Sequence, residues 1–344
     1  MVGWRRFYAG IWRLHRCLWS SSADSLKRRP IEVNVLIQGV APFRLKPLMV
    51  ERVWGFHDLK PWYAYTSETA IGEAWLSGDK CVVETGPLAG KTLDAAAAAE
   101  PSLLGARRDG TAWEYFPLLI KYLFPKEKLS VQVHPDDAYA ALFGGTTQAK
   151  TECWYVLQAE PDAGILLGLK PGTSKDDVRR AIGDGTLEQL MVRVPVAAGD
   201  MVYVSAGTMH ALEPGAVILE IQQNSDTTYR LYDYGRPREL HLERGLEVLK
   251  LETDAGKVVP QSIAGGERLI QVPHFTVEKY ALTSEALTVA SKGAECLIAL
   301  KGSGTASSAA GDVELVAGAA VIVPATVGQY SLRGDAEVVR AFVS

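Results

Sequence analysis

Hydrophobic and polar residues follow one another in short runs along most of the chain, and glycine or proline separates each run from the next. The runs IEVNVLI (31–37) and KCVVET (80–85) are examples, and this texture is typical of strands joined by turns. Beyond Arg268 almost every run is of this kind. The sequence therefore predicts a mainly β protein that ends in an antiparallel sandwich or small barrel. Three central runs are also predicted strands: ECWYVLQA (152–159), DMVYVSA (200–206) and AVILEIQQ (216–223).

Helix-forming residues interrupt the strand pattern at several places. The alanine-rich segment 92–105 begins near Asp94, which we expect to be its N-cap, and a second mainly apolar segment follows at 114–124. Ser174 is placed to cap the first turn of a third segment. We predict three helical insertions in the sheet: DAYAALFG (137–144), SKDDVRRAIGDGTLEQLM (174–191) and HLERGLEVLK (241–250).

A chain of 344 residues is long for one hydrophobic core, since single cores stop growing at about 250 to 300 residues. The polar, glycine-rich stretch LETDAGKVVPQSIAGGE (251–267) is the best candidate for a linker. We therefore predict a first domain at 31–258, a linker at 259–267 and a second domain at 268–344. Residues 1–30 hold seven Lys or Arg and one Asp, and we expect them to form a disordered basic extension.

Charge and cysteine content narrow the class of protein. The net charge is −4, which disfavours the broad basic surface that nucleic-acid binders use. No apolar run reaches the roughly 18 to 20 residues that a membrane-spanning helix needs. In the basic extension, Arg13 and Arg16 break the apolar core that a signal peptide requires. The four cysteines are far apart in the sequence, so no disulfide framework is indicated and we expect a cytoplasmic protein.

Two potential ligands lie on one face of a predicted strand in LSVQVHPDDAY (129–139). Because side chains alternate along a strand, Gln132 and His134 point to the same side. A polar strand face turned to water would explain either residue alone. Lys150 and Glu152 have the same spacing at the start of the next predicted strand, so an ammonium group and a carboxylate would enter one cavity.

An acidic residue, Glu220, lies inside the apolar run AVILEIQQ. An ionised carboxylate there is costly unless it is paired or functional, and Arg230 is a natural partner. Arg230 is suited either to stabilising developing negative charge or to binding phosphate. Asp226 lies between them in NSDTT, where an ordinary turn residue is an equally good interpretation. Lys128 and Arg236 are further cations that could reach an anion pocket, although solvated surface charge explains both.

Two segments of the chain share a hairpin pattern, VAAGDMVYVSAGTMH (196–210) and VAGAAVIVPATVGQY (316–330). When Gly199 is placed on Gly318, His210 falls on Gln329. The first segment resembles the second motif of the cupin superfamily, in which a histidine enters a β-barrel. If the repeat is real, the chain has two related barrels and only the first kept its histidine.

The chain also resembles one cupin branch, the type I phosphomannose isomerases, from about Leu45 onward. The family pattern usually has a second glycine where this chain has Phe56. Six landmarks stand in the family's usual order: LKPLMVERVWG, IGEAWLS followed by GPLAGKTLD, KLSVQVHPDD, AKTECWYVL, AGTMHAL and ILEIQQNSDTTYRLYDYGR. The resemblance implies a mainly β fold with helical insertions and two cupin (jelly-roll β-barrel) domains, of which the second lacks a metal.

The resemblance also implies the site. Its metal ligands would be Gln132, His134, Glu152 and His210, a mixed nitrogen and oxygen set that suits a divalent ion such as one Zn²⁺ per chain. Its catalytic groups would be four charged residues, with Glu220 as the leading base candidate and Asp226 the second: Lys150, Glu220, Asp226 and Arg230.

The implied activity is the interconversion of D-mannose 6-phosphate and D-fructose 6-phosphate through an enediol, so the expected partner is a small sugar phosphate. Two alternatives stay open at this point. The first is another metal cupin, either an isomerase of a different phosphosugar or an oxygenase. A non-catalytic sugar-phosphate-binding protein would keep the pocket without turnover. No nucleotide cofactor is expected, because no Walker or Rossmann glycine motif occurs in its required context.

Overall fold

The computed structural model describes residues 39–343. The predicted extension at 1–30 and the run 31–37 lie outside the described residues. Within the described part, 22 strands form three sheets, and every pairing between named strands is antiparallel. Four α-helices accompany the sheets, so the prediction of a mainly β protein with helical insertions is confirmed.

The largest sheet has ten strands and joins the two ends of the described chain. Strand β1 pairs with β21 in the register Phe43↔Ile322 and Leu45↔Ala320. The strand order is β15 (Gln261–Ile263), β16 (Gly266–Gln271), β17 (Thr276–Leu282), β22 (Gln329–Phe342), β19 (Glu295–Ser308), β21 (Ala320–Val323), β1 (Phe43–Lys46) and β4 (Val82–Val83), with β18 (Leu287–Ala290) beside β22 and β20 (Gly311–Val316) beside β19.

The other two sheets carry the candidate site. The seven-stranded sheet runs β14 (Gly256–Val258), β10 (Met201–Val204), β7 (Glu152–Ala159), β12 (Ala216–Gln223), β5 (Leu118–Leu123), β3 (Thr66–Ser77) and β2 (Leu48–Asp58). The five-stranded sheet runs β13 (Tyr229–Tyr232), β6 (Val131–Val133), β11 (His210–Leu212), β8 (Gly164–Leu169) and β9 (Met191–Pro195). The sequence predicted β7, β10 and β12 in the seven-stranded sheet and β6 in the five-stranded sheet.

The helices lie at positions that the sequence predicted, with two corrections: the apolar segment 114–124, which was grouped with the helix-forming segments, contains strand β5, and the first helix has a different N-cap. The helices are α1 (Leu93–Ala99), α2 (Asp137–Phe143), α3 (Lys175–Asp184) and α4 (Leu242–Val248). Ser174 caps α3 in a reciprocal arrangement with Asp177, an interaction that stabilises a helix by about 1 kcal/mol. Asp94 is not the N-cap of α1, because the extended residue Thr92 occupies that place and Asp94 lies in the first turn. Three short 3₁₀ turns complete the helical segments: Pro101–Leu103, Leu187–Leu190 and Ala325–Val327.

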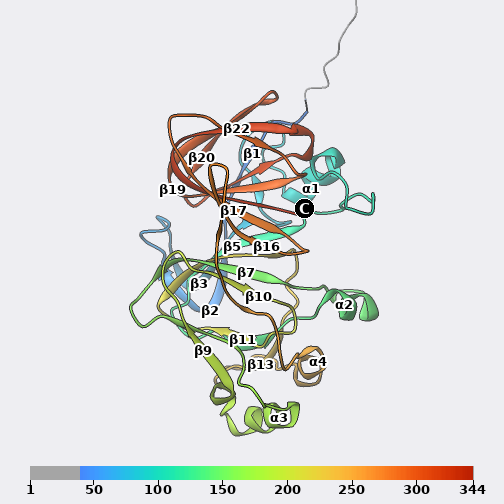
Figure 1. Cartoon of the computed structure of the whole chain (residues 1–344), viewed down its shortest axis with the longest axis vertical. Coiled ribbons are helices and arrows are strands. Elements are labelled where there is room, and N and C mark those ends of the chain that lie inside the picture. The colour runs from blue at the N-terminus through green and yellow to red at the C-terminus, as the bar shows by residue number, and fades with distance from the viewer. Residues whose placement is uncertain (1–38, 344) are drawn as a thin grey trace, which may run out of the picture. The chain divides into compact units, whose positions relative to one another are not determined.

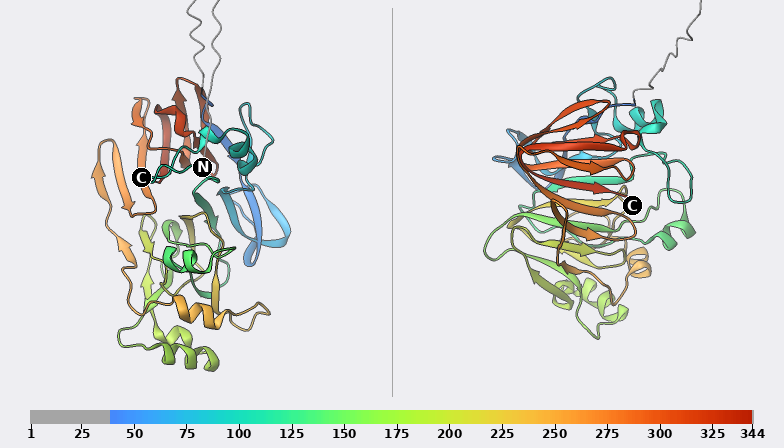
Figure 2. Two further views of the ribbon diagram at one scale, coloured as in Figure 1. Left: turned by 90° about the vertical axis from the view of Figure 1, so that its right-hand side faces the viewer. Right: turned by 45° about the horizontal axis from the view of Figure 1, so that its top comes forward.

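The sheets lie in layers (Figure 1). Hydrophobic cores hold these layers together. Ile298 and Val339 of the ten-stranded sheet pack in one core with Tyr122 and Ile221 of the seven-stranded sheet. Figure 2 shows the C-terminal strands, in orange and red, as one layer of this arrangement. On its other face the seven-stranded sheet packs against the five-stranded sheet, in a core that contains Trp154.

The two expected closed barrels are not seen as hydrogen-bonded cylinders, because each of the three sheets within residues 39–343 has open edges. The seven- and five-stranded sheets face each other across a shared core, as the two halves of a sandwich do. Residues 259–267, the expected linker, hold β15 and the start of β16. The division into two domains at this segment stays a prediction.

Candidate metal centre and active-site cavity

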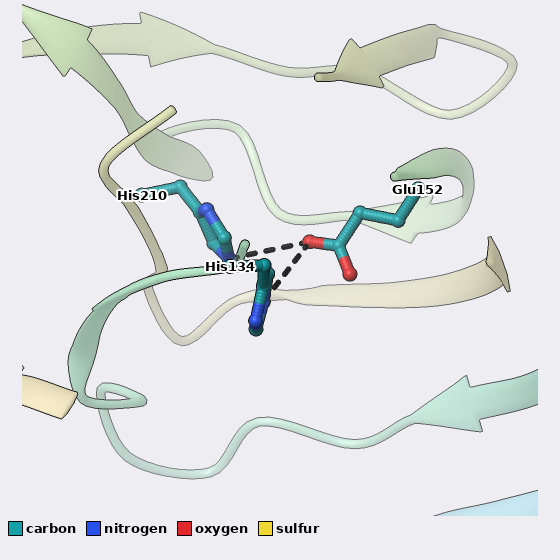
Figure 3. Close-up of side chains that lie close together, drawn as sticks. All are labelled: His134, Glu152 and His210. Carbon is teal, nitrogen blue, oxygen red and sulfur yellow. Dashed lines mark ion pairs between the residues drawn. The ribbon is translucent and has the colours of Figure 1, made fainter. Parts of the chain in front are cut away.

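Two histidines and one glutamate meet between the facing sheets (Figure 3). His134 directly follows β6, His210 begins β11, and Glu152 begins β7 in the opposite sheet. Strands β6 and β11 are neighbours, and their register pairs His210 with Gln132. All three side chains are buried, and their ligand atoms lie within 4.8 Å of one another.

A tight turn sets the position of His210. Gly207 has φ +89°, and a Cβ atom there would lie 3.0 Å from the backbone oxygen of Val248. Its N–H donates to the carbonyl of His134 at 2.9 Å, so the turn before His210 is tied to the end of β6. The glycine of AGTMHAL is therefore required both by its backbone conformation and by close packing.

The hydrogen bonds of the two imidazoles define which ring nitrogen faces the glutamate. Nδ1 of His134 lies 2.8 Å from the carbonyl of Thr227, and Nδ1 of His210 lies 2.9 Å from that of Thr208. A carbonyl can only accept, so both Nδ1 atoms carry hydrogen and both Nε2 atoms of the neutral rings hold lone pairs. A hydrogen bond from Nδ1 to a backbone carbonyl is a usual way to orient an imidazole toward a metal ion.

Those lone pairs converge on a carboxylate oxygen that accepts no hydrogen bond. Glu152 Oε1 lies 3.2 Å from Nε2 of His210 and 3.9 Å from Nε2 of His134, and it has no hydrogen-bond donor. Two imidazole nitrogens thus face a buried carboxylate oxygen that has no hydrogen-bond donor, and a cation between the three atoms would satisfy all of them. The residues present therefore fit a divalent metal ion.

Burial also sets the protonation of this group. Burial and the charge of Lys150 lower the pKa of His210 to about 4, and the same causes lower the pKa of His134 well below its usual value. Burial raises the pKa of Glu152 to about 7, against the opposing charge of Lys150. Both imidazoles are consequently neutral at neutral pH, which is the form that binds metals.

The fourth expected ligand, Gln132, lies beside the same group. Its Nε2 is 3.2 Å from Nε2 of His210, and its Oε1 accepts from Ser130 Oγ at 3.4 Å. A half-turn of the amide would bring the oxygen to the position of the nitrogen. The structure therefore brings all four predicted ligands together.

Lys150 also lies where the spacing predicted. Its side chain is buried, and its Nζ is 2.5 Å from Glu152 Oε2 and 3.2 Å from His134 Nε2. The ammonium group thus contacts two of the candidate metal ligands, and Lys150 also lines the cavity described below.

Glu220 is buried on β12, but its partner is not the arginine that we expected. Lys121 of β5 is directly opposite Glu220 in the sheet, with Nζ 2.9 Å from Oε2, and Trp154 of β7 donates from Nε1 at 3.0 Å. Burial would raise the pKa of Glu220, but the charges of Lys121 and Lys150 and these hydrogen bonds lower it to about 2. Arg230 instead contacts Asp233.

Lys121 belongs to a line of buried charges that sequence analysis missed. It lies 3.8 Å from Glu73, which accepts from both Nε and Nη2 of Arg52 at 2.8 and 3.1 Å and from Trp75 at 2.7 Å. The available signal was a lysine in the apolar run PLLIKYLF and a glutamate in IGEAWL, since a charge in a buried strand needs a partner.

A cavity of about 320 Å³ opens beside the candidate ligands. Asp226 and Arg230 lie in its wall, together with Arg238, which sequence analysis did not single out. Lys128 and Arg236 are not among the lining residues, since Lys128 pairs with Glu188. The wall is formed by Arg52, Trp54, Glu73, Lys121, Leu123, Leu129, Ser130, Gln132, Lys150, Glu220, Asp226, Thr228, Arg230 and Arg238.

Two facing antiparallel sheets with a buried nitrogen and oxygen ligand set between them, beside a cation-rich cavity, form a cupin-type fold whose residues could hold a metal ion. Comparison with known proteins identifies the family. Residues 43–167 match the model of the phosphomannose isomerase type I catalytic domain, and residues 267–343 match that of the mannose-6-phosphate isomerase cupin domain. The chain belongs to the type I phosphomannose isomerase (mannose-6-phosphate isomerase) family and is an enzyme of that family.

Similar proteins cover nearly the whole described chain. The mannose-6-phosphate isomerase of Streptococcus mutans is 36% identical over 87% of this chain and 97% of its own. The mannose-6-phosphate isomerase ManA of Bacillus subtilis is 34% identical over 86% of this chain and 97% of its own. The crystal structure of the Bacillus subtilis mannose 6-phosphate isomerase matches with a TM-score of 0.79 and 31% identity, over 88% of this chain and 100% of that one. No helix in the described part of the chain is long and apolar enough to span a membrane.

Proposed function

We propose that this enzyme interconverts D-mannose 6-phosphate and D-fructose 6-phosphate with the help of one divalent metal ion. The observation that carries the proposal is the meeting of His134, Glu152 and His210 beside the cavity, with two imidazole lone pairs directed at Glu152 Oε1 and no hydrogen-bond donor for that oxygen. The names of the similar proteins supply the substrate. The geometry supplies a reason for each part of the site.

The metal would be held by His134, Glu152 and His210, with the amide oxygen of Gln132 as a fourth ligand. Two imidazoles, a carboxylate and an amide form a mixed nitrogen and oxygen donor set that suits Zn²⁺. When bound, such an ion supplies Lewis acidity that polarises oxygen atoms of the sugar.

Two buried lysines are placed to offset negative charge on the substrate. Isomerisation moves a hydrogen between C1 and C2 through an enediol, whose oxygens carry developing negative charge. Lys150 and Lys121 both line the cavity, and each already binds a carboxylate inside the protein. Fixed ammonium groups in a low-dielectric site stabilise such charge without having to reorganise.

Glu220 is our leading candidate for the base that moves the proton, and Asp226 is the second. The pKa of about 2 keeps Glu220 ionised at neutral pH, but the ion pair with Lys121 makes it a weak base. As the sugar oxygen gains charge, Lys121 can shift its hydrogen bond from Glu220 to that oxygen. The carboxylate then becomes more basic at the moment when it must accept the proton.

We also propose that residues 268–344 form a cupin domain without a metal, and that the enzyme works in the cytoplasm. The family model of the cupin domain matches residues 267–343, and the metal-type cluster found among residues 39–343 lies outside that segment. The buried cysteines Cys81, Cys153 and Cys296 are free thiols, which is consistent with a reducing compartment.

A coupled assay tests the proposal. Purified protein should convert mannose 6-phosphate, lose that activity after chelation and regain it when Zn²⁺ is restored. Bound iron with oxygen uptake and no isomerase activity would show an oxygenase instead. Sugar-phosphate binding without turnover would show a binding protein.

A further inference from the structure

The buried side chain of Asp233 lies beside three arginines, Arg236 and Arg238 of the segment YDYGRPR (232–238) and Arg230 just before it. Both oxygens of Asp233 accept from Arg238, through Nε and Nη2, each at 2.6 Å. Arg236 Nη1 lies 3.2 Å from Oδ1, and Arg230 Nε lies 3.9 Å from Oδ2. The Asp233 side chain is only 2% exposed, so a single carboxylate sets the position of three guanidinium groups.

The backbone of this segment is held in an uncommon shape. Tyr234 has φ +56° and is the non-glycine residue with positive φ among residues 39–343, and Gly235 follows at φ +79°. Tyr234 is kept there by a hydrogen bond from its hydroxyl to Glu188 at 2.7 Å and by Arg236, whose guanidinium lies 5.7 Å from the ring centre. Strained residues persist where surrounding contacts fix them, and they gather at functional sites.

The three arginines differ in how many of their N–H donors are free to bind a ligand. Arg238 and Arg230 line the cavity, and Arg236 does not. Within residues 39–343, the Nη1 group of Arg238 has no acceptor, and Nε of Arg230 is buried without a hydrogen bond. Arg236 is instead used by Glu127 Oε2 at 2.8 Å and by the carbonyl of Lys128 at 2.9 Å. Arg230 already donates from Nη1 to the carbonyl of Glu239 at 2.8 Å. The cavity wall therefore contains one guanidinium, that of Arg238, with a free Nη1 group, and a second, that of Arg230, which is only partly used.

We propose that Arg238, with Arg230 beside it, binds the phosphate group of the substrate, and that Asp233 is the positioning residue that holds Arg238 for this task. This inference rests on the proposed function, because it assigns the end of the substrate that is remote from the metal ligands. Guanidinium groups match the oxygens of phosphate in pairs, and a fixed guanidinium loses little freedom on binding. The enzyme thereby distinguishes a phosphorylated sugar from a free one.

A purely electrostatic role and a positioning role of Asp233 predict opposite changes in phosphate affinity when Asp233 is replaced by a neutral residue. If only the net charge of the cavity mattered, Asp233→Asn would remove a repulsive carboxylate and tighten phosphate binding. If Asp233 acts by holding Arg238, the same substitution releases the guanidinium and weakens phosphate binding. The sign of the change therefore separates a positioning role from a general electrostatic one.

The experiment compares wild type with Asp233→Asn, Arg238→Gln and the matched control Arg236→Gln, all loaded with metal. Calorimetric titration gives the Kd for inorganic phosphate, and the coupled assay gives KM and kcat for mannose 6-phosphate. We expect Arg238→Gln to raise Kd and KM by about 10- to 100-fold, the range for losing a charged hydrogen bond, with little change in kcat. Asp233→Asn should raise both in the same direction by about 10-fold. Arg236→Gln should stay within about 2-fold of wild type.

Each result has a definite meaning. Unchanged Kd and KM in Arg238→Gln, or tighter phosphate binding in Asp233→Asn, would overturn the inference. Should Asp233→Asn fail to fold, as judged by circular dichroism and metal content, Arg238→Gln carries the test alone. A wild type that binds phosphate through Arg238 but does not isomerise mannose 6-phosphate would refute the proposed function and leave the anion site standing.

Discussion

Two buried clusters of charge, one in each half of the described chain, differ in how completely their members are satisfied. In the C-terminal sheet, Arg340 binds Glu295 through Nε at 2.9 Å and through Nη2 at 2.5 Å, and binds Glu278 through Nη1 at 2.8 Å. Tyr330 and Tyr280 donate to the same glutamates at 2.8 and 2.6 Å. Every carboxylate in this cluster has donors.

The cluster at the cavity lacks this completeness. Glu152 Oε1 faces two imidazole lone pairs, and the Lys150 ammonium reaches only the other oxygen. When every buried acceptor in a network has a donor, the network stabilises the fold without a ligand. When several buried acceptors point at one another, a bound cation can satisfy them. Buried charge alone therefore does not mark an active site, but unmatched buried charge does.

The largest effect should come from Glu152→Gln, which keeps the shape of the side chain and removes its charge. We expect activity with mannose 6-phosphate to fall by about 1,000-fold or more, because the ligand set loses its only carboxylate. Bound zinc, measured by elemental analysis, should fall in parallel. The metal-free variant should unfold at the same temperature as metal-free wild type or higher, since one unmatched acceptor is gone. A clear loss of stability in the metal-free variant would mean that the cavity cluster is structural after all.

Glu220→Gln should reduce kcat by about 100- to 10,000-fold, the range for losing a positioned base. Bound zinc should be retained, because Glu220 is not among the candidate ligands. Asp226→Asn is the matched control and should have a much smaller effect on kcat. If the two effects were reversed, Asp226 would be the base and Glu220 the partner that fixes Lys121.

Arg340→Met tests the matched cluster. Removing the cation leaves Glu295 and Glu278 buried without their main partner, which should lower the free energy of unfolding by about 3 to 5 kcal/mol. Urea unfolding measures this loss. Activity per folded molecule should stay unchanged, and a selective loss of activity in the folded fraction would contradict the structural role of this cluster.

Tyr330→Phe should give the smallest effect. The substitution removes one hydrogen bond to Glu295 and leaves both bonds from Arg340, so the free energy of unfolding should drop by about 1 kcal/mol. The melting temperature, followed by circular dichroism, is sufficient to measure it. A loss as large as that of Arg340→Met would indicate that the hydroxyl, rather than the ion pairs, holds the cluster together.

Much of the site was predictable because its residues depend on local spacing. Gln132 and His134 share a strand face by alternation, Lys150 precedes Glu152 by the same interval, and Ser174 caps a helix through its own neighbours. These relations involve residues a few positions apart. Local spacing therefore predicted most strands and helices and the two pairs Gln132/His134 and Lys150/Glu152, whereas the meeting of these pairs with His210 was implied by the resemblance to the isomerase family.

The pairing of Lys121 with Glu220 was not predictable, because it depends on the register between β5 and β12. Neither segment alone indicates which of its residues lies opposite which residue of the other strand. The sequence analysis therefore paired Glu220 with Arg230, a basic residue that lies close to it in the sequence. The open sheets were missed for a similar reason. Alternating patterns show which face of a strand is buried, and they do not show whether the last strand of a sheet meets the first.

The pairing of β1 with β21 has a consequence for how the chain is made. Phe43 leaves the ribosome early, but its partner Ile322 is translated much later, by roughly fifteen seconds to a minute at ordinary rates of synthesis. Until then the first strand has no neighbour on that edge and is exposed to other nascent chains. A truncated gene that stops before residue 268 would leave that edge bare for good, so we expect its product to aggregate rather than to yield a small working enzyme.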